Sequence, residues 1–168
     1  DTTKLCVVGS VGIVPGTPPD YAAAYGMEFG FGLNDAPVAG GGGGVADAGA
    51  DGGAAPLEES QPWPPGAVTG FSFTIDGPVI PPTLRFKVQP FGAPVDPPFC
   101  AAIVPSIASG TSSTRAFRFS EVTSACYNGA GGLPATAPFQ NIAWQVPADP
   151  MAAHDYDFCV SNIQPILN

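Results

Sequence analysis

The sequence predicts an all-β fold, an antiparallel β-sandwich of the jelly-roll kind with a long Gly-rich loop insert. Short segments alternate apolar and polar residues with a period of two, which is typical of strands with one buried face. Glycine and proline are abundant, at 22 and 21 of 168 residues, which favours turns and disfavours long helices. We expect about eight or nine strands in one domain spanning residues 1–168.

The clearest alternation lies in residues 69–88. The large side chains that share one face are Phe71, Phe73 and Ile75 before a proline-rich turn, and Leu84, Phe86 and Val88 after it. We interpret this segment as a hairpin. Two strands cannot bury such a face alone, so other strands must cover it.

The remaining strands are expected from shorter patterns. They cover residues 4–9, 27–33, 99–103, 115–122, 141–146 and 156–167. Phe117, Phe119, Ile142, Trp144 and Val146 should face inward, and Arg115 and Arg118 at least partly outward. Residues 9–19 should form a loop or bent edge in which Val11, Ile13 and Val14 are partly buried.

In residues 27–33, Met27, Phe29, Phe31 and Leu33 share one face, and Glu28 and two glycines share the other. Glycines at alternate positions indicate that a backbone or a flat ligand approaches closely, or that the strand bends. Residues 36–56, which include Gly40–Gly44, are a low-complexity insert. Such a composition cannot bury a core, so we expect a surface loop.

The charge balance excludes some partners. Fourteen acidic residues outnumber five basic ones, for a formal charge of −9. This charge repels phosphate backbones and anionic membrane surfaces, so we expect no nucleic-acid partner. No apolar run approaches the roughly 18 residues that span a bilayer, so we expect no membrane insertion. The start at Asp1 fits a mature secreted protein or a trimmed segment.

The four cysteines suit an oxidising compartment. Without a Cys-x-x-Cys pair, and with one histidine, they do not form a zinc pattern. Four cysteines allow three pairings. We predict Cys6–Cys159, between the first and last strands, and Cys100–Cys126, which flank the 115–122 strand. The alternative is Cys6–Cys126 with Cys100–Cys159.

Several segments together resemble a known family. They are LCVVGSVGIV, MEFGFGL, GFSFTIDG, LRFKV, FRFSEV, ACYNG, NIAWQVP and YDFCVSNIQPI. Their order is similar to that of the galactose-binding-like β-sandwich modules of secreted bacterial polysaccharide-degrading enzymes. The resemblance implies a secreted, non-catalytic, carbohydrate-binding module whose partner is a polysaccharide or another glycan, at the cell exterior or surface.

In such modules sugars stack on exposed aromatic rings. The aromatic residues expected in loops, which the resemblance makes candidates for binding sugar, are Tyr21, Tyr25, Trp63 and Tyr127. Many members also hold a structural calcium near the chain ends. Asp155 and Asp157 are the candidate donors here, the alternative being solvated acidic side chains, and no other cofactor is expected.

No catalytic constellation is evident, and we expect no enzyme activity. His154 is the only histidine available as a base, and it lies in a segment read as a surface loop. Glycosidases need two carboxylates across a cleft. Only Glu28 and Asp76 sit inside strand patterns, both on faces opposite the large apolar side chains.

The alternative function is a self-assembling extracellular structural subunit of a filament, sheath or surface layer. Residues 5–14 and 160–167 contain no charged residue. If either is a sheet edge, it lacks the charges that normally prevent edge-to-edge pairing. Such an edge could continue its sheet into a neighbouring copy.

Overall fold

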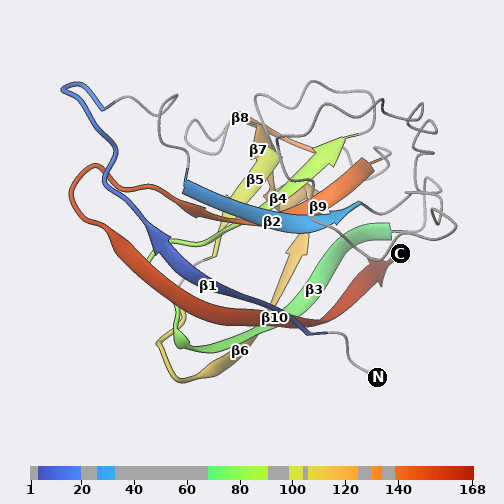
Figure 1. The fold of residues 1–168 in the computed structure, drawn as a ribbon. Coiled ribbons are helices and arrows are strands. Elements are labelled where there is room, and N and C mark those ends of the chain that lie inside the picture. Colours follow the sequence, from blue (N-terminus) through green and yellow to red (C-terminus); the bar gives the residue numbers. More distant parts are fainter. Residues whose placement is uncertain are drawn as a thin grey trace, which may run out of the picture.

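A computed structural model describes residues 4–19, 26–32, 68–90, 99–103, 106–124, 130–133 and 139–168. Within these ranges, ten strands and one short 3-10 helix are present. The strands form two antiparallel sheets that stack face to face (Figure 1). The predicted β-sandwich is therefore confirmed. The 36–56 insert lies outside the described residues. Among the residues that are described, no helix is long and apolar enough to cross a membrane.

The smaller sheet has four strands in the order β1-β10-β3-β6. Their bounds are Leu5–Val11 for β1, His154–Leu167 for β10, Val68–Val79 for β3 and Ser112–Arg118 for β6. The first and last strands are neighbours, as predicted. β1 pairs with β10 over its whole length without a register shift, and it forms one edge of the sheet.

The larger sheet has six strands in the order β2-β9-β4-β5-β7-β8. Their bounds are Gly26–Gly32 for β2, Phe139–Pro147 for β9, Arg85–Pro90 for β4, Phe99–Ala102 for β5, Thr123–Ser124 for β7 and Ala130–Gly132 for β8. β8 lies in a segment for which the sequence pattern predicts no strand. β2, β9 and β4 carry the polar side chains considered below.

The hairpin predicted for residues 69–88 is wrong. Both strands exist, but β3 belongs to the smaller sheet and β4 to the larger one. The proline-containing turn carries the chain from one sheet to the other, and Ile80 N donates to Ser109 Oγ at 3.0 Å in this turn. The two apolar faces therefore oppose each other across the core, where the rings of Phe73 and Phe86 lie 5.2 Å apart.

Aromatic rings from both sheets fill the interior. Phe73, Phe86, Phe119 and Trp144 are all fully buried there. Phe73 connects the layers, with ring centroids 5.0 Å from Trp144 and 5.9 Å from Phe117. Offset and edge-to-face contacts of this kind add stability beyond the area that they bury.

The strand predicted for residues 115–122 is also partly wrong. β6 ends at Arg118, and a 3-10 turn, η1 (Phe119–Glu121), follows. The Glu121 carboxylate accepts a hydrogen bond from Arg118 N at 2.6 Å. Phe119 is nevertheless buried as expected, because the turn directs its ring into the core. Arg118 is exposed, whereas Arg115 pairs with Phe73 and is half-buried on the inner face at the sheet edge.

The segment that follows β1 differs from expectation at one residue. Val11 and Val14 are buried, but Ile13 is 54% exposed. Ile13 forms an isolated bridge with Asp149, and Val14 N donates to the Asp149 carbonyl at 3.0 Å. This backbone pairing turns the side chain of Ile13 away from the core.

Candidate functional site

The aromatic residues predicted to bind sugar, Tyr21, Tyr25, Trp63 and Tyr127, all lie outside the described residues. The structure therefore does not test whether they come together. Among the described strands, the outer face of the larger sheet brings polar side chains of three neighbouring strands into contact. We take this face, formed by β2, β9 and β4, as the candidate site.

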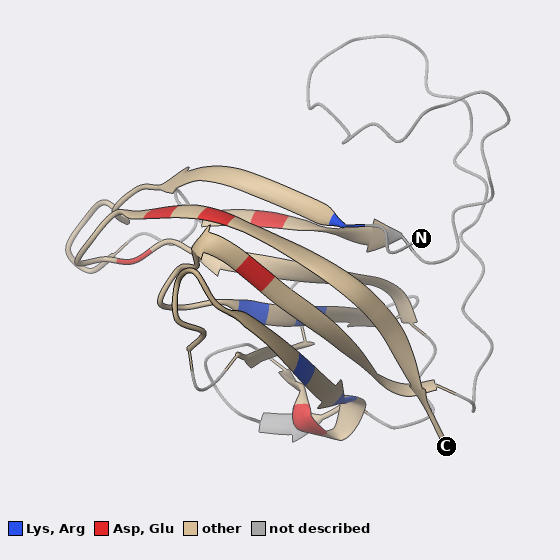
Figure 2. Cartoon of the chain, turned by 90° about the horizontal axis from the view of Figure 1, so that it is seen from below, with Lys and Arg blue, Asp and Glu red and all other residues tan. Residues whose placement is uncertain are grey.

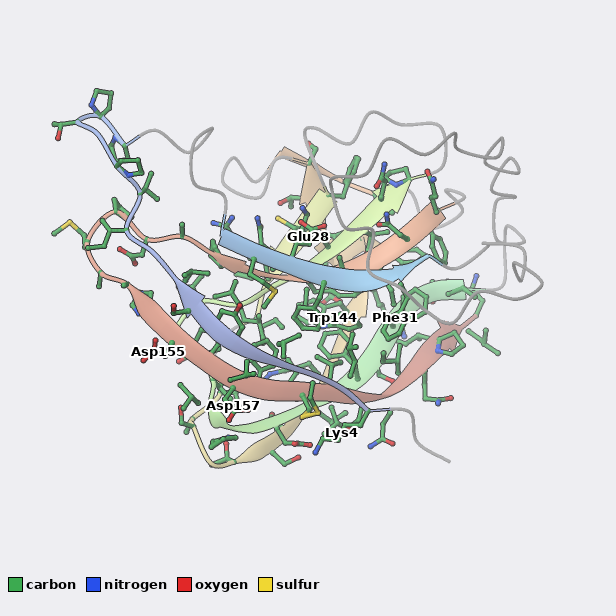
Figure 3. The ribbon with its side chains drawn as sticks, in the orientation of Figure 1. Lys4, Glu28, Phe31, Trp144, Asp155 and Asp157 are labelled. Carbon is green, nitrogen blue, oxygen red and sulfur yellow. A yellow bond between two sulfur atoms is a disulfide. The ribbon has the colours of Figure 1, made fainter. Side chains whose placement is uncertain are left out.

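Alternation places these side chains. Trp144 and Phe86 are cross-strand partners and point into the core, so the residues on either side of them point outward. In Figure 3, Phe31 and Trp144 lie between the sheets, and Glu28 lies on the opposite side of β2. The register gives the rows Glu28–Gln145–Arg85, Gly30–Ala143–Lys87 and Gly32–Asn141–Gln89.

Side-chain contacts tie the three strands together. Lys87 on β4 forms an ion pair with Glu28 on β2, across the intervening strand β9. The pair can bridge β9 because the β9 residue beside Lys87 is Ala143, whose methyl group does not obstruct it. Lys87 is largely buried, with 14% of its side chain exposed, whereas 45% of the Glu28 side chain is exposed.

Amide and guanidinium groups extend this array. Asn141 Nδ2 donates to Gln89 Oε1 at 2.9 Å, and Arg85 Nη1 donates to Gln145 Oε1 at 3.5 Å. Asn141 and Gln89 each have further donor and acceptor capacity beyond the bond that joins them. The face therefore combines a carboxylate, three amides, a guanidinium and an ammonium group whose positions the sheet fixes.

The centre of this face is buried. Gln145 and Ala143 point away from the core, yet only 6% and 5% of their surfaces are exposed. β9 is therefore buried on both faces. Where water is partly excluded, hydrogen bonds from such groups are stronger than on an open surface.

The alternating glycines of β2 have a structural cause. A Cβ built on Gly30 would lie 2.3 Å from the Ile142 carbonyl oxygen and 2.7 Å from Ala143 Cβ. Gly26 has a φ of 95°, which L side chains rarely adopt. Of the explanations offered by the sequence, close approach of another backbone accounts for Gly30. Glu28 is consequently the only side chain that β2 contributes to this face.

On the outer face of the smaller sheet, acidic residues lie on the neighbouring strands β10 and β3 (Figure 2). Lys4 Nζ reaches across β10 to Asp76 Oδ1 at 2.7 Å, and Thr74 and Thr114 share a hydrogen bond of 3.0 Å. Asp155 and Asp157 project from β10 on this face, beside β1. Among the described residues, no three His, Cys, Asp or Glu side chains cluster as metal ligands would.

Glu28 and Asp76, the two carboxylates singled out in strand patterns, lie on opposite outer faces of the sandwich. The packed core of both sheets separates them. They cannot flank one substrate in the way that a pair of glycosidase carboxylates does.

His154 begins β10 rather than lying in a loop. Its Nε2 is 3.4 Å from Asp149 Oδ2, while Asp149 Oδ1 accepts hydrogen bonds from Met151 N at 2.6 Å and Ala152 N at 3.3 Å. The hydrogen bond from Met151 N is the main cause of a lowered pKa for Asp149, and His154 adds to it. These contacts order the turn between β9 and β10.

The Cys6–Cys159 disulfide is confirmed, with the two sulfur atoms 2.09 Å apart. The two cysteines are directly opposite each other on β1 and β10. The alternative pairing of Cys6 with Cys126 is therefore wrong. Cys100 is disulfide-bonded as well. Because Cys126 lies outside the described residues, Cys100–Cys126 stays a prediction.

No family model, curated protein or solved structure matches this chain. The site is thus defined by its own geometry. Of its residues, the sequence pattern had singled out Glu28 alone. Lys87, Gln89 and Asn141 were visible as polar positions within apolar alternation, but only the order β2-β9-β4 brings them together.

Proposed function

We propose that the protein is a secreted, non-catalytic carbohydrate-binding module with a galactose-binding-like jelly-roll fold. The observation that carries this proposal is the polar array on the outer face of the larger sheet, formed by Glu28, Lys87, Gln89 and Asn141 around the buried Gln145. Carboxylate, amide and ammonium groups held at fixed spacing complement the vicinal hydroxyls of a sugar, each of which donates and accepts hydrogen bonds.

Two further features support the proposal. Successive strands β1, β2, β3 and β4 alternate between the two sheets, as strands of a jelly roll do. The Cys6–Cys159 disulfide suits an oxidising, extracellular compartment. Trp63 and Tyr25 remain the predicted stacking rings.

A glycan array probed with the full chain tests the proposal, followed by titration calorimetry with a retained glycan. The double variant Gln89→Ala/Asn141→Ala removes a hydrogen-bonded amide pair from the site. Losing two sugar contacts of about 1 kcal/mol each should weaken binding roughly 10- to 30-fold. Trp63→Ala and Tyr25→Ala test the predicted stacking rings in the same assay.

The matched control is Thr74→Ala/Thr114→Ala, which removes one cross-strand side-chain hydrogen bond from the opposite outer face. It should leave the affinity unchanged. Retention of no glycan at all, or an equal loss of affinity in both double variants, would contradict the proposed site.

A further inference from the structure

The inference concerns the free edge of β1, in the sheet that does not carry the proposed sugar site. The Cα atoms of Cys6 and Cys159 are 4.0 Å apart. This short separation marks them as a non-hydrogen-bonded pair of the antiparallel ladder. By alternation, Leu5, Val7 and Gly9 bond to β10, whereas Cys6 and its alternates Val8 and Ser10 direct their N–H and C=O groups away from it.

This edge is open to solvent. Cys6, Val8, Gly9 and Ser10 are exposed, and Val8 is 77% exposed. β1 contains no charge, no proline and no bulge, which are the usual protections of an edge strand. The opposite edge of the same sheet, β6, carries two arginines. In Figure 1, β1 runs alongside β10, and the strand order makes it an edge of the smaller sheet.

Charges near the two ends of β1 are opposite in sign. Lys4 immediately precedes the strand, and Asp155 lies on the same outer face beside Ser10, near its other end. If two β1 strands pair antiparallel about Val8, the Cα of Lys4 in one copy lies about 12 Å from that of Asp155 in the other. Within each copy the Lys4 ammonium pairs with Asp76 across β10, so its attraction to Asp155 of the other copy acts over this distance without direct contact. Parallel pairing would instead place lysine beside lysine.

We propose that β1 pairs antiparallel with β1 of a second copy of this chain about a two-fold axis. Val8 then faces Val8, and Cys6 faces Ser10, with each opposed pair exchanging two backbone hydrogen bonds. The pairing joins two four-stranded sheets into one continuous sheet. Because the same strand is used by both copies, the contact closes on itself and gives a dimer rather than a filament.

The disulfide makes this contact a pairing of intact sandwiches. Cys6–Cys159 holds β1 on its own β10, so the strand cannot exchange into the neighbour. An interface of one strand edge is small, which favours a dissociation constant of about 1–100 μM. The dimer is independent of sugar binding, because β1 belongs to the other sheet.

Sedimentation velocity of the full chain from about 1 μM to about 1 mM tests the proposal. The sedimenting mass should rise from that of one chain to twice that value. Val8→Lys places two ammonium groups side by side at the centre of the interface, and should keep the protein monomeric. Val8→Pro removes an N–H that points away from β10, and should act likewise without breaking the β1–β10 ladder.

The matched control is Val79→Lys. Val79 is exposed too, to 38%, and both Val8 and Val79 lie opposite Asp157 of β10. Val79, however, is on β3, an interior strand of the sheet. This variant should dimerise like the unmodified protein, which separates loss of the edge contact from an altered net charge. Circular dichroism of each variant checks that the sandwich has formed.

Amide hydrogen exchange gives a second readout. Rising protein concentration should slow exchange at the amides of Val8 and Ser10, and leave those of Val7 and Gly9 unchanged. The proposal is overturned by a protein that stays monomeric throughout, by equal dimerisation of Val8→Lys and Val79→Lys, or by concentration-dependent protection confined to other strands.

Discussion

Removing the Cys6–Cys159 disulfide should lower the free energy of unfolding by about 5 kcal/mol at 25 °C. The bond joins residues 153 positions apart, so it closes nearly the whole chain into a loop. Loop-closure theory assigns about 17 cal/mol/K of lost unfolded-state entropy to a loop of that length. Cys6 is exposed, so its replacement by serine removes little packing and the effect reports the crosslink itself.

Urea unfolding, followed through the fluorescence of the buried Trp144, measures the loss in the Cys6→Ser/Cys159→Ser variant. With a slope of about 2 kcal/mol per molar, the midpoint should fall by about 2–3 M. Each single variant should lose as much as the double one, because either substitution breaks the same bond. A loss below about 1 kcal/mol, or single losses that add, would refute the reasoning.

Three further substitutions test the core and one turn. Gly9→Ala should lower the free energy of unfolding by about 1–3 kcal/mol, because the added Cβ would lie 2.5 Å from Tyr156 Oη. Adding Tyr156→Phe, which removes that oxygen, should recover part of the loss. An unchanged melting temperature of Gly9→Ala would contradict this. Phe73→Ala should cost about 3–5 kcal/mol, and more than Phe117→Ala, because Phe73 is fully buried between the sheets and Phe117 is not; equal losses would contradict that account. Because the folded protein lowers the pKa of Asp149, the ionised carboxylate stabilises the fold above pH 3.8, its unfolded pKa, and this stability is lost as the pH falls through the folded pKa. The stability advantage of the unmodified protein over Asp149→Asn should therefore vanish in strong acid. A difference in stability that does not depend on pH would argue against this account.

The sequence predicted which side chains enter the core, because burial on one face imposes a period of two on a strand. Phe73, Phe86 and Trp144 are all buried as expected. Alternation does not reveal which strands pair, however. It indicated two adjacent amphipathic strands around the proline-rich turn, and a hairpin and a crossing between sheets satisfy it equally. β7 and β8, of two and three residues, are too short to show any period.

The candidate site was less accessible to sequence reasoning. Glu28 and Lys87 are 59 residues apart in the chain and meet only because β2 and β4 flank β9. No local pattern encodes that order. The Cys6–Cys159 pair could be predicted because it needed a simpler assumption, that the first and last strands are neighbours. The predicted aromatic contacts of Trp63 and Tyr25 lie outside the described residues and stay predictions.

The most direct test of the proposed function is an NMR titration of the isotopically labelled full chain with a glycan retained on the array. Chemical-shift changes should centre on the outer-face residues of β2, β9 and β4, including the side-chain amides of Gln89 and Asn141. Glycan-induced shifts confined to the outer face of the smaller sheet, around Thr74 and Thr114, would contradict the account.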